Sequence, residues 1–466
     1  MSDHRAVPLR GTQWMLRLLP GLLCAAAVLA WAPDAGATPI YALRAANACD
    51  TCHIEPSGWA NPPDADRLCT LDCRGCHVSP TGGGLRTPSG LYYGREVLPT
   101  WGTRPSQFAD PEKYRPEGHP KKGRARLFED FTGWWPGSID MQDIKDRFGD
   151  IDPDPKVRFG FDIRAMVYLP TKGEADPAVF PMQSDFHLAY RPLEQFVTYL
   201  SGGLAGRRAE DNYIDSDRKD EREVLDYFTV REAFVMMDRM PNNMYVRAGR
   251  FAPPFGWRIP DHTSFIRRDL QFDQYRSVFG VEGGWNPNYP YANVAAFYQG
   301  AEFWPGDQND KGLGAAATFG LRELNYQYGG SLHYLSRTDD GAADDLTAGV
   351  NWGVTLYPLV YLGELDFKRS IADGDAPSAS GLVAYHELNW LMFRGLSSML
   401  KYDWSDLNLD TKDDHSHRVT AGVTWHPYTH LQIDAQYRKN WVGTNPVLDL
   451  GDSTADETLL MFRGWF

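Results

Sequence analysis

The chain lacks several features that would place it in common protein classes. After residue 31, no apolar run approaches the ~20 residues that a membrane-spanning helix needs. Stretches with the apolar periodicity of an amphipathic helix are also scarce. The 466 residues hold 47 Lys and Arg against 61 Asp and Glu, a formal net charge of −14. This acidic balance argues against nucleic acid as a partner. Cysteine is rare, at six residues, yet five of them lie between residues 49 and 76.

The first 37 residues have the form of a secretory signal peptide. Three arginines within residues 1–17 precede an almost wholly apolar run over residues 18–31. Residues 35–37, Ala-Gly-Ala, then match the small-x-small pattern of a cleavage site. We therefore expect a mature chain that starts near Thr38. A retained helical anchor is the alternative, and the shortness of the apolar run disfavours it.

Most of the chain shows alternation of apolar and polar residues with a period of two. In residues 157–169, VRFGFDIRAMVYL, one strand face carries only apolar side chains, from Val157 to Leu169. The other face carries Arg158, Asp162 and Arg164. In a membrane barrel, the apolar face of such a strand meets lipid and its polar face lines the lumen. The pattern therefore favours a transmembrane β-barrel over a soluble sandwich.

The connections between the expected strands support this interpretation, because short turns alternate with long polar loops. That alternation is typical of outer-membrane barrels, with the turns in the periplasm and the loops outside. Counting the strands predicts an all-β, antiparallel barrel of about sixteen strands over residues 157–466, wide enough to hold something in its lumen. The chain ends in Phe466, as the last strand of bacterial outer-membrane barrels does in an aromatic residue. The expected turns are 191–194, 240–243, 286–290, 322–323, 357–358, 393–395 and 426–429, and the long loops include 206–223, 336–345, 370–380 and 405–416.

Two C-x-x-C-H boxes lie between the signal and the barrel, CDTCH at 49–53 and CRGCH at 73–77. Two cysteines spaced in this way can form thioethers to one haem, and the imidazole of the next residue can bind the iron. The doubled motif in an exported chain therefore predicts two covalently bound haem c groups. The expected attachment residues are Cys49, Cys52, Cys73 and Cys76, and the expected iron ligands are His53 and His77.

Zinc and redox-disulfide readings of these cysteines are weaker. Adjacent Cys and His cannot easily bind one tetrahedral ion, and a thioredoxin-like pair would need a βαβ context that the sequence lacks. The glycines at 82–84 favour a haem, because they permit positive φ and a close approach to a flat macrocycle. Cys69 has no evident partner, and the sequence does not assign its role.

With these motifs in place, the chain resembles the fused cytochrome–porins of extracellular electron transfer, whose best-known branch is the one-haem iron-oxidising outer-membrane cytochrome. This chain carries two C-x-x-C-H boxes where that branch has one. The resemblance implies an outer-membrane protein with a signal peptide (1–37), an irregular dihaem cytochrome segment inside the lumen (38–115), a linker or plug (116–156) and a barrel (157–466). It also implies a periplasmic c-type cytochrome and extracellular iron, or another redox substrate, as partners.

A haem that only transfers electrons needs a second axial ligand. His119, in RPEGHPKKG, is one candidate, and the alternative is a solvent-exposed histidine. His262 is the other candidate, and the alternative is a histidine at the barrel rim. It lies in FAPPFGWRIPDHTSFIRR, an expected external loop whose prolines and aromatics predict that it folds into the lumen. Three arginines of that loop could bind haem propionates: Arg258, Arg267 and Arg268.

The function that this interpretation predicts is an electron conduit across the outer membrane, acting as an iron oxidase or a metal reductase at the cell surface. Two other functions stay open. One is a diffusion porin in which the cytochrome segment gates or anchors. The other is a terminal oxyanion reductase with one five-coordinate haem. Conductance would favour the porin, and a high-spin optical signal would favour the reductase.

Overall fold

The fold was analysed in a computed structural model of the protein. It describes residues 72–92, 101, 156–171, 177–205, 228–272, 276–287, 289–300, 311–323, 326–338, 343–356, 358–371, 378–393, 395–428, 430–442 and 456–466. The expected signal peptide, the first C-x-x-C-H box and His119 lie outside these residues. Among the helices of the described part, none has the length and apolar character needed to cross a membrane.

Sixteen β-strands dominate the described residues. They are β1 (Val157–Pro170), β2 (Ala178–Leu193), β3 (Phe196–Ala205), β4 (Phe228–Met240), β5 (Met244–Phe251), β6 (Val278–Trp285), β7 (Pro290–Gln299), β8 (Gly312–Arg322), β9 (Tyr326–Arg337), β10 (Asp344–Leu356), β11 (Leu359–Ile371), β12 (Ala379–Phe393), β13 (Leu396–Asp406), β14 (Ser416–Trp425), β15 (Leu431–Val442) and β16 (Glu457–Trp465). The helical pieces are η2 (Cys73–Gly75), α4 (Pro88–Tyr92), η9 (Pro241–Asn243) and α7 (Phe265–Arg268).

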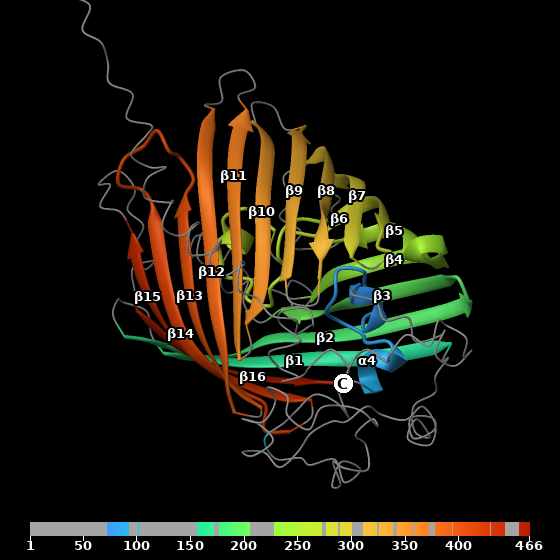
Figure 1. The fold of residues 1–466 in the computed structure, drawn as a ribbon, viewed down its shortest axis with the longest axis horizontal. Helices are drawn as coiled ribbons and strands as arrows, with labels where there is room; N and C mark the ends of the chain where they lie inside the picture. Colours follow the sequence, from blue (N-terminus) through green and yellow to red (C-terminus); the bar gives the residue numbers. More distant parts are fainter. Residues whose placement is uncertain are drawn as a thin grey trace, which may run out of the picture. The chain divides into compact units, whose positions relative to one another are not determined.

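Each strand pairs with its neighbours in sequence, and β1 pairs with β16, so that the sheet closes into a barrel (Figure 1). The pairing of β1 with β16 is antiparallel, as is the pairing of β1 with β2. The prediction of an all-β antiparallel barrel with sixteen strands, beginning at Val157, is confirmed. The predicted short turns also lie where consecutive strands meet, for example at η9 between β4 and β5.

Exposure follows the two-residue period that the sequence predicted. On β1, Phe161 and Ile163 are 43% and 49% exposed, whereas Asp162 and Arg164 are 5% and 8% exposed. The polar side chains therefore face the lumen, where Arg463 of β16 binds the Asp162 carboxylate with its Nε at 3.0 Å. This arrangement reverses that of a soluble protein, because its apolar side chains point away from the interior.

The outward face is apolar around the whole ring. Burying such side chains in lipid is favourable by about 25 cal/mol per Å² of apolar surface removed from water, and an apolar outer band is a property of outer-membrane barrels. The fold and this surface together indicate an outer-membrane protein. Outward-facing residues that are at least two-fifths exposed include Val235, Val281, Val294, Leu313, Phe319, Leu332, Val350, Leu388, Leu400 and Phe462.

The terminal residue takes part in closing the barrel. The amide of Phe466 donates to the Phe161 carbonyl at 3.0 Å, and the Phe161 amide donates to the Phe466 carbonyl at 3.2 Å. The two rings also stack, with centroids 5.9 Å apart. The last aromatic residue of the chain is therefore part of the β1–β16 seam.

The connection between β5 and β6 folds into the barrel. Its residues 252–272, which we call the strap, include α7 and bury Phe255, Phe265 and Ile266. These side chains form one cluster with Val383 and Tyr385 of β12. The prediction that this proline- and aromatic-rich loop enters the lumen is confirmed.

Replacing outward-facing Val350 by arginine tests the orientation of the wall. Val350 lies in the middle of β10 and is 51% exposed. Because an arginine at the middle of the bilayer costs about 2–4 kcal/mol, we expect Val350→Arg to lower the free energy of unfolding in lipid by that amount. Urea titration of the protein refolded in vesicles measures it. Val350→Leu, which keeps an apolar side chain, should unfold close to the wild-type urea concentration. Equal stability of the arginine variant would contradict a lipid-facing position.

Candidate functional site

The second C-x-x-C-H box lies in a compact loop, residues 72–92, which we call the box segment. Asp72 caps η2, and its carboxylate accepts from Arg74 Nε at 2.6 Å. The chain then reverses, so that His77 and Arg86 form an antiparallel bridge. The amide of Val78 donates to the Leu85 carbonyl at 2.9 Å. The box is therefore held against the residues that follow it in sequence.

The reversal is made by three consecutive glycines with positive φ, namely +78° at Gly82, +72° at Gly83 and +57° at Gly84. Residues with a side chain rarely adopt this backbone conformation. The turn lies over the box: a Cβ on Gly82 would be 3.6 Å from Cys73 Sγ, and the Gly83 backbone contacts the His77 imidazole. The expected positive φ of these glycines is confirmed, and their contact with a haem stays a prediction.

The side chains of the box have the chemistry that haem attachment requires. No disulfide joins Cys73 to Cys76, and burial raises the pKa of the Cys73 thiol. Burial, together with the charge of Arg86, lowers the pKa of His77 to about 4, so that its imidazole is neutral at pH 7. His77 Nδ1 is buried without a hydrogen-bond partner. Two thiols and a neutral imidazole on one turn therefore fit a c-type haem.

The box segment contacts inward-facing residues of the barrel. Ser79 Oγ donates to the Glu232 carboxylate of β4 at 3.1 Å, and the Leu85 amide donates to the Tyr199 hydroxyl of β3 at 3.3 Å. Arg74 lies over the Tyr245 ring of β5, 4.5 Å from its centroid. These contacts join the box segment to three adjacent strands.

Of the three arginines expected to bind propionates, Arg258 contacts the box segment. Its guanidinium donates to the Thr81 hydroxyl and lies 3.8 Å from Glu232. Arg267 is buried near the Glu364 carboxylate on the opposite wall. Arg268 is exposed and pairs with Asp269 at 2.6 Å. The structure therefore brings Arg258 to the box.

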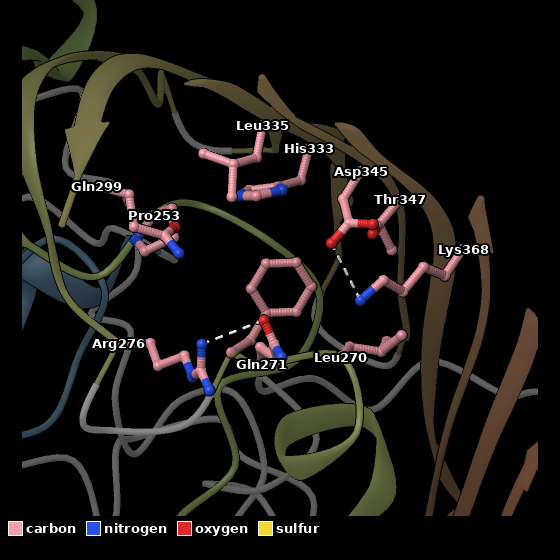
Figure 2. Close-up of a pocket in the computed structure, with 11 residues that line it drawn as sticks. Pro253, Leu270, Gln271, Arg276, Gln299, His333, Leu335, Asp345, Thr347 and Lys368 are labelled. Carbon is pink, nitrogen blue, oxygen red and sulfur yellow. Dashed lines mark hydrogen bonds and ion pairs between the residues drawn. The ribbon is translucent and has the colours of Figure 1, made fainter. Parts of the chain in front are cut away.

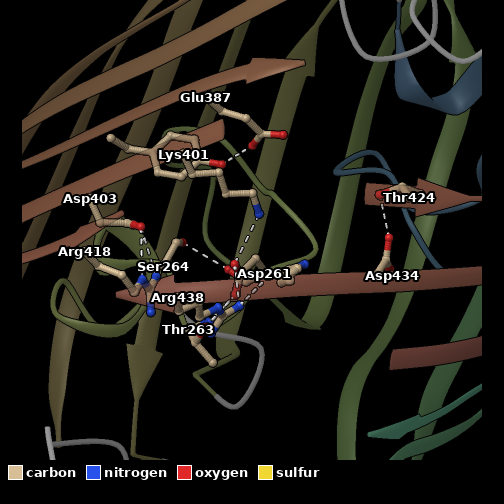
Figure 3. A network of polar contacts seen from close by, with 12 residues as sticks. Asp261, Thr263, Ser264, Glu387, Lys401, Asp403, Arg418, Thr424, Asp434 and Arg438 are labelled. Atoms are coloured by element: carbon tan, nitrogen blue, oxygen red, sulfur yellow. Dashed lines mark hydrogen bonds and ion pairs between the residues drawn. The ribbon is translucent and has the colours of Figure 1, made fainter. Parts of the chain in front are cut away.

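The strap is anchored to the far wall of the barrel. Asp261 lies 3.3 Å from Lys401 Nζ on β13 and 3.1 Å from Arg438 on β15 (Figure 3). The amide of Phe265 donates to Asp403 of β13 at 3.0 Å. In a closed ring of sixteen strands, β13 is eight places from β5, where the strap begins. The strap therefore crosses the lumen.

His262 lies on this strap, next to Asp261. Burial lowers its pKa to about 4, although the Asp261 carboxylate opposes the shift, and the charges of Arg164 and Arg231 add to it. The imidazole is thus neutral at pH 7. Its role as an iron ligand stays a prediction, as does that of His119.

A hollow lies between the strap and strands β7, β9, β10 and β11 (Figure 2). Lys368 Nζ and the Asp345 carboxylate are 3.3 Å apart on its wall. His333 is stacked on Phe297, with ring centroids 5.4 Å apart. Among the described residues, no group of three or more His, Cys, Asp or Glu side chains could hold a metal ion. This hollow is therefore a polar recess without a metal-binding set.

Sequence reasoning missed the barrel residues that hold the box segment and the strap. Tyr199, Glu232 and Lys401 all face inward, which the two-residue period of their strands could have indicated. The sequence does not show which loop each of these residues contacts, because the partners are far apart in sequence. Lys401, for example, lies 140 residues from Asp261.

Comparisons with known proteins bear on the barrel alone. No family model matches the sequence, and no curated protein is similar to it. Among solved structures, OmpF of Salmonella typhi in complex with daunomycin is 10% identical, with a TM-score of 0.50 over 66% of this chain and 97% of that one. OmpT of Vibrio cholerae lacking loop L8 is 12% identical, with a TM-score of 0.48 over 66% of this chain and 99% of that one. The outer-membrane channel DcaP of Acinetobacter baumannii is 10% identical, with a TM-score of 0.48 over 66% and 97%. The described barrel has a porin-like fold.

Removing the Asp261 charge tests whether the strap closes the lumen. Breaking a buried ion pair by deleting one partner costs about 3–5 kcal/mol, and Asp261→Asn leaves Lys401 and Arg438 without their shared carboxylate. We expect planar-bilayer conductance to be absent in the wild type and present in Asp261→Asn. An Asp269→Asn control, which alters an exposed pair, should stay closed. An equally closed Asp261→Asn channel would contradict this role of the ion pair.

The ionisation of the Asp261 carboxylate should make closure of the lumen depend on pH. Burial disfavours its ionisation, but Arg438 and Lys401 outweigh burial and hold the pKa of Asp261 well below its usual range. Its stabilising contribution is therefore complete above the unfolded-state pKa of about 3.9 and is lost as pH falls through the lowered folded value. Wild-type conductance should stay absent from pH 7 down to about pH 4. Opening already at pH 5–6 would show that another group holds the strap.

Proposed function

We propose that the protein carries electrons across the outer membrane through two haem c groups bound to its N-terminal segment, with the barrel as their insulating wall. The observation that carries this proposal is the contact of the Cys73–His77 box segment with inward-facing residues, such as Glu232 and Tyr199. A C-x-x-C-H box would not need such contacts if the segment lay free in the periplasm.

The donor set supports haem c at the second box. Cys73 and Cys76 supply two thiols for thioethers, and His77 supplies a neutral imidazole. A c-type haem, when bound, supplies a one-electron carrier whose potential depends on its axial ligands and burial. The first box, Cys49–His53, has the same residue types at the same spacing, and we assign it a second such carrier.

The chain's own residues perform three tasks in this proposal. The glycine turn presents no side chains to the box, so that a flat ligand could approach the backbone closely. Arg258 places a positive charge beside the box, where it can balance a propionate. The strap crosses the lumen and excludes solutes, so that charge moves without an aqueous path.

The partners follow from this arrangement. In outer-membrane barrels, the short turns and the two termini of the barrel chain face the periplasm. The box segment contacts Asn243 in the β4–β5 turn, which lies at that end. A periplasmic c-type cytochrome would exchange electrons there. On the outer side, the redox partner would be iron or another extracellular substrate, and the protein would then act as an iron oxidase or metal reductase.

A diffusion porin is the second candidate, and the porin-like fold together with the charged inner wall favours it. In that case the box segment would anchor or gate the pore. The two functions differ in what passes through the barrel, since a porin passes ions and a conduit passes electrons only.

Proteoliposomes separate the two functions. The protein is matured with haem and reconstituted around trapped oxidised cytochrome c, and ferrous iron is added outside. We expect reduction of the trapped cytochrome without leakage of a trapped anionic dye. Cys73→Ala with Cys76→Ala should halve the pyridine haemochrome signal and stop electron transfer, because one stage of the relay is lost.

The matched control is Cys69→Ala, which removes a neighbouring cysteine outside either box and should keep both haems and the transfer rate. Dye leakage with no haem-dependent reduction would support the porin. A colourless wild-type protein would overturn the conduit, as would unchanged transfer in the double variant.

A further inference from the structure

The inner wall beside the box segment holds a histidine for which the barrel alone offers no function. His187 lies on β2, faces the lumen and is 4% exposed. Its Nε2 is buried without a hydrogen-bond partner. A buried polar atom left in this state costs about 1–3 kcal/mol, and native structures rarely keep one without a reason.

The other nitrogen of His187 is firmly held. Nδ1 lies 2.9 Å from Ser201 Oγ and 3.2 Å from the Tyr199 hydroxyl, both on β3. The Tyr199 ring is stacked nearly parallel to the imidazole, at an interplanar angle of 8°. Metal-binding histidines usually have this arrangement, in which one ring nitrogen is fixed by a hydrogen bond and the other carries the lone pair for the metal.

The glycine turn of the box segment brings this histidine next to the box. A Cβ on Gly84 would lie 3.5 Å from both Cε1 and Nδ1 of His187. The preceding residue, Gly83, contacts the His77 imidazole. Two consecutive residues of one turn therefore lie beside the two imidazoles, Gly83 at His77 of the motif and Gly84 near the Nδ1–Cε1 edge of His187 on the wall.

The wall and the box segment approach each other closely beside His187. Its partner across the β1–β2 pair is Gly160, which has no side chain. A Cβ at Gly160 would lie 2.9 Å from Leu85 Cδ1, so even a methyl group there would press on the box segment. The absence of a side chain at Gly160 thus lets the box segment come close to the wall at His187.

We propose that His187 is the second axial ligand of the iron bound by Cys73, Cys76 and His77, with Ser201 as its positioning residue. This proposal rests on the proposed function, since it requires haem at the second box. It adds a ligand from the barrel wall, so that the cytochrome segment and the barrel share one metal site. His262, on the strap, then remains for the iron of the first box.

The test uses the full chain with Cys49→Ala and Cys52→Ala, which leaves a single haem at the second box. Ferric optical and paramagnetic spectra of this protein should be low-spin. Adding His187→Ala should give a high-spin signal, and added imidazole should restore the low-spin state. A His333→Gln control, which changes another buried lumen histidine (7% exposed), should stay low-spin.

Two further variants keep the test decisive if removal of the side chain disturbs folding. His187→Met should stay six-coordinate and low-spin, with a raised reduction potential, because a thioether ligand favours ferrous iron. Ser201→Ala should leave the spin state unchanged and raise the potential, because loss of the hydrogen bond at Nδ1 makes the imidazole a weaker donor. A merely structural role for Ser201 would not move the potential.

The outcomes distinguish failure of the His187 assignment from failure of the proposed electron-conduit function. A low-spin spectrum that survives His187→Ala overturns His187 as ligand while the conduit stands. An unchanged reduction potential in His187→Met also overturns His187 as the ligand. Absence of haem from the Cys49→Ala, Cys52→Ala protein, shown by a pyridine haemochrome assay, overturns haem binding at the second box and the ligand assignment with it.

Discussion

Everything described here depends on one constraint: in a bilayer, each backbone amide and carbonyl must find its partner within the protein. The ring of strands meets that constraint by pairing β1 with β16. Phe466 completes the seam through two backbone hydrogen bonds with Phe161. Once the sheet is closed, the two-residue period divides all side chains between lipid and lumen. The polar residues of the inner face are then the only wall against which the box segment and the strap can be fixed.

Inside that wall, buried charges are paired in ways that hold loops rather than line an open channel. Glu232 accepts from Ser79 of the box segment and lies near Arg258 of the strap. On the opposite side, Asp261 of the strap is paired with Lys401 and Arg438 of the wall. Because such pairs gain little net energy over apolar packing, their effect here is positional: they define where each loop sits.

The barrel could be predicted from sequence because its signals are local. Alternation over 157–169 gave the lipid and lumen faces of β1, and loop lengths gave the number of strands. The entry of the strap was readable from its prolines and aromatics. Its anchoring was not, because Asp261 lies 177 residues from Arg438. His187 was not singled out from the sequence, because only the fold puts it on the inner wall with Gly84 beside it. The boxes themselves were recognised from their spacing, and their haems remain a proposal.

The pairing of the strap with late strands has a consequence for biogenesis. The box segment precedes every strand in the chain, whereas β13 and β15, which hold Asp261, are among the last strands made. The strap can therefore lock only after nearly the entire sheet has formed.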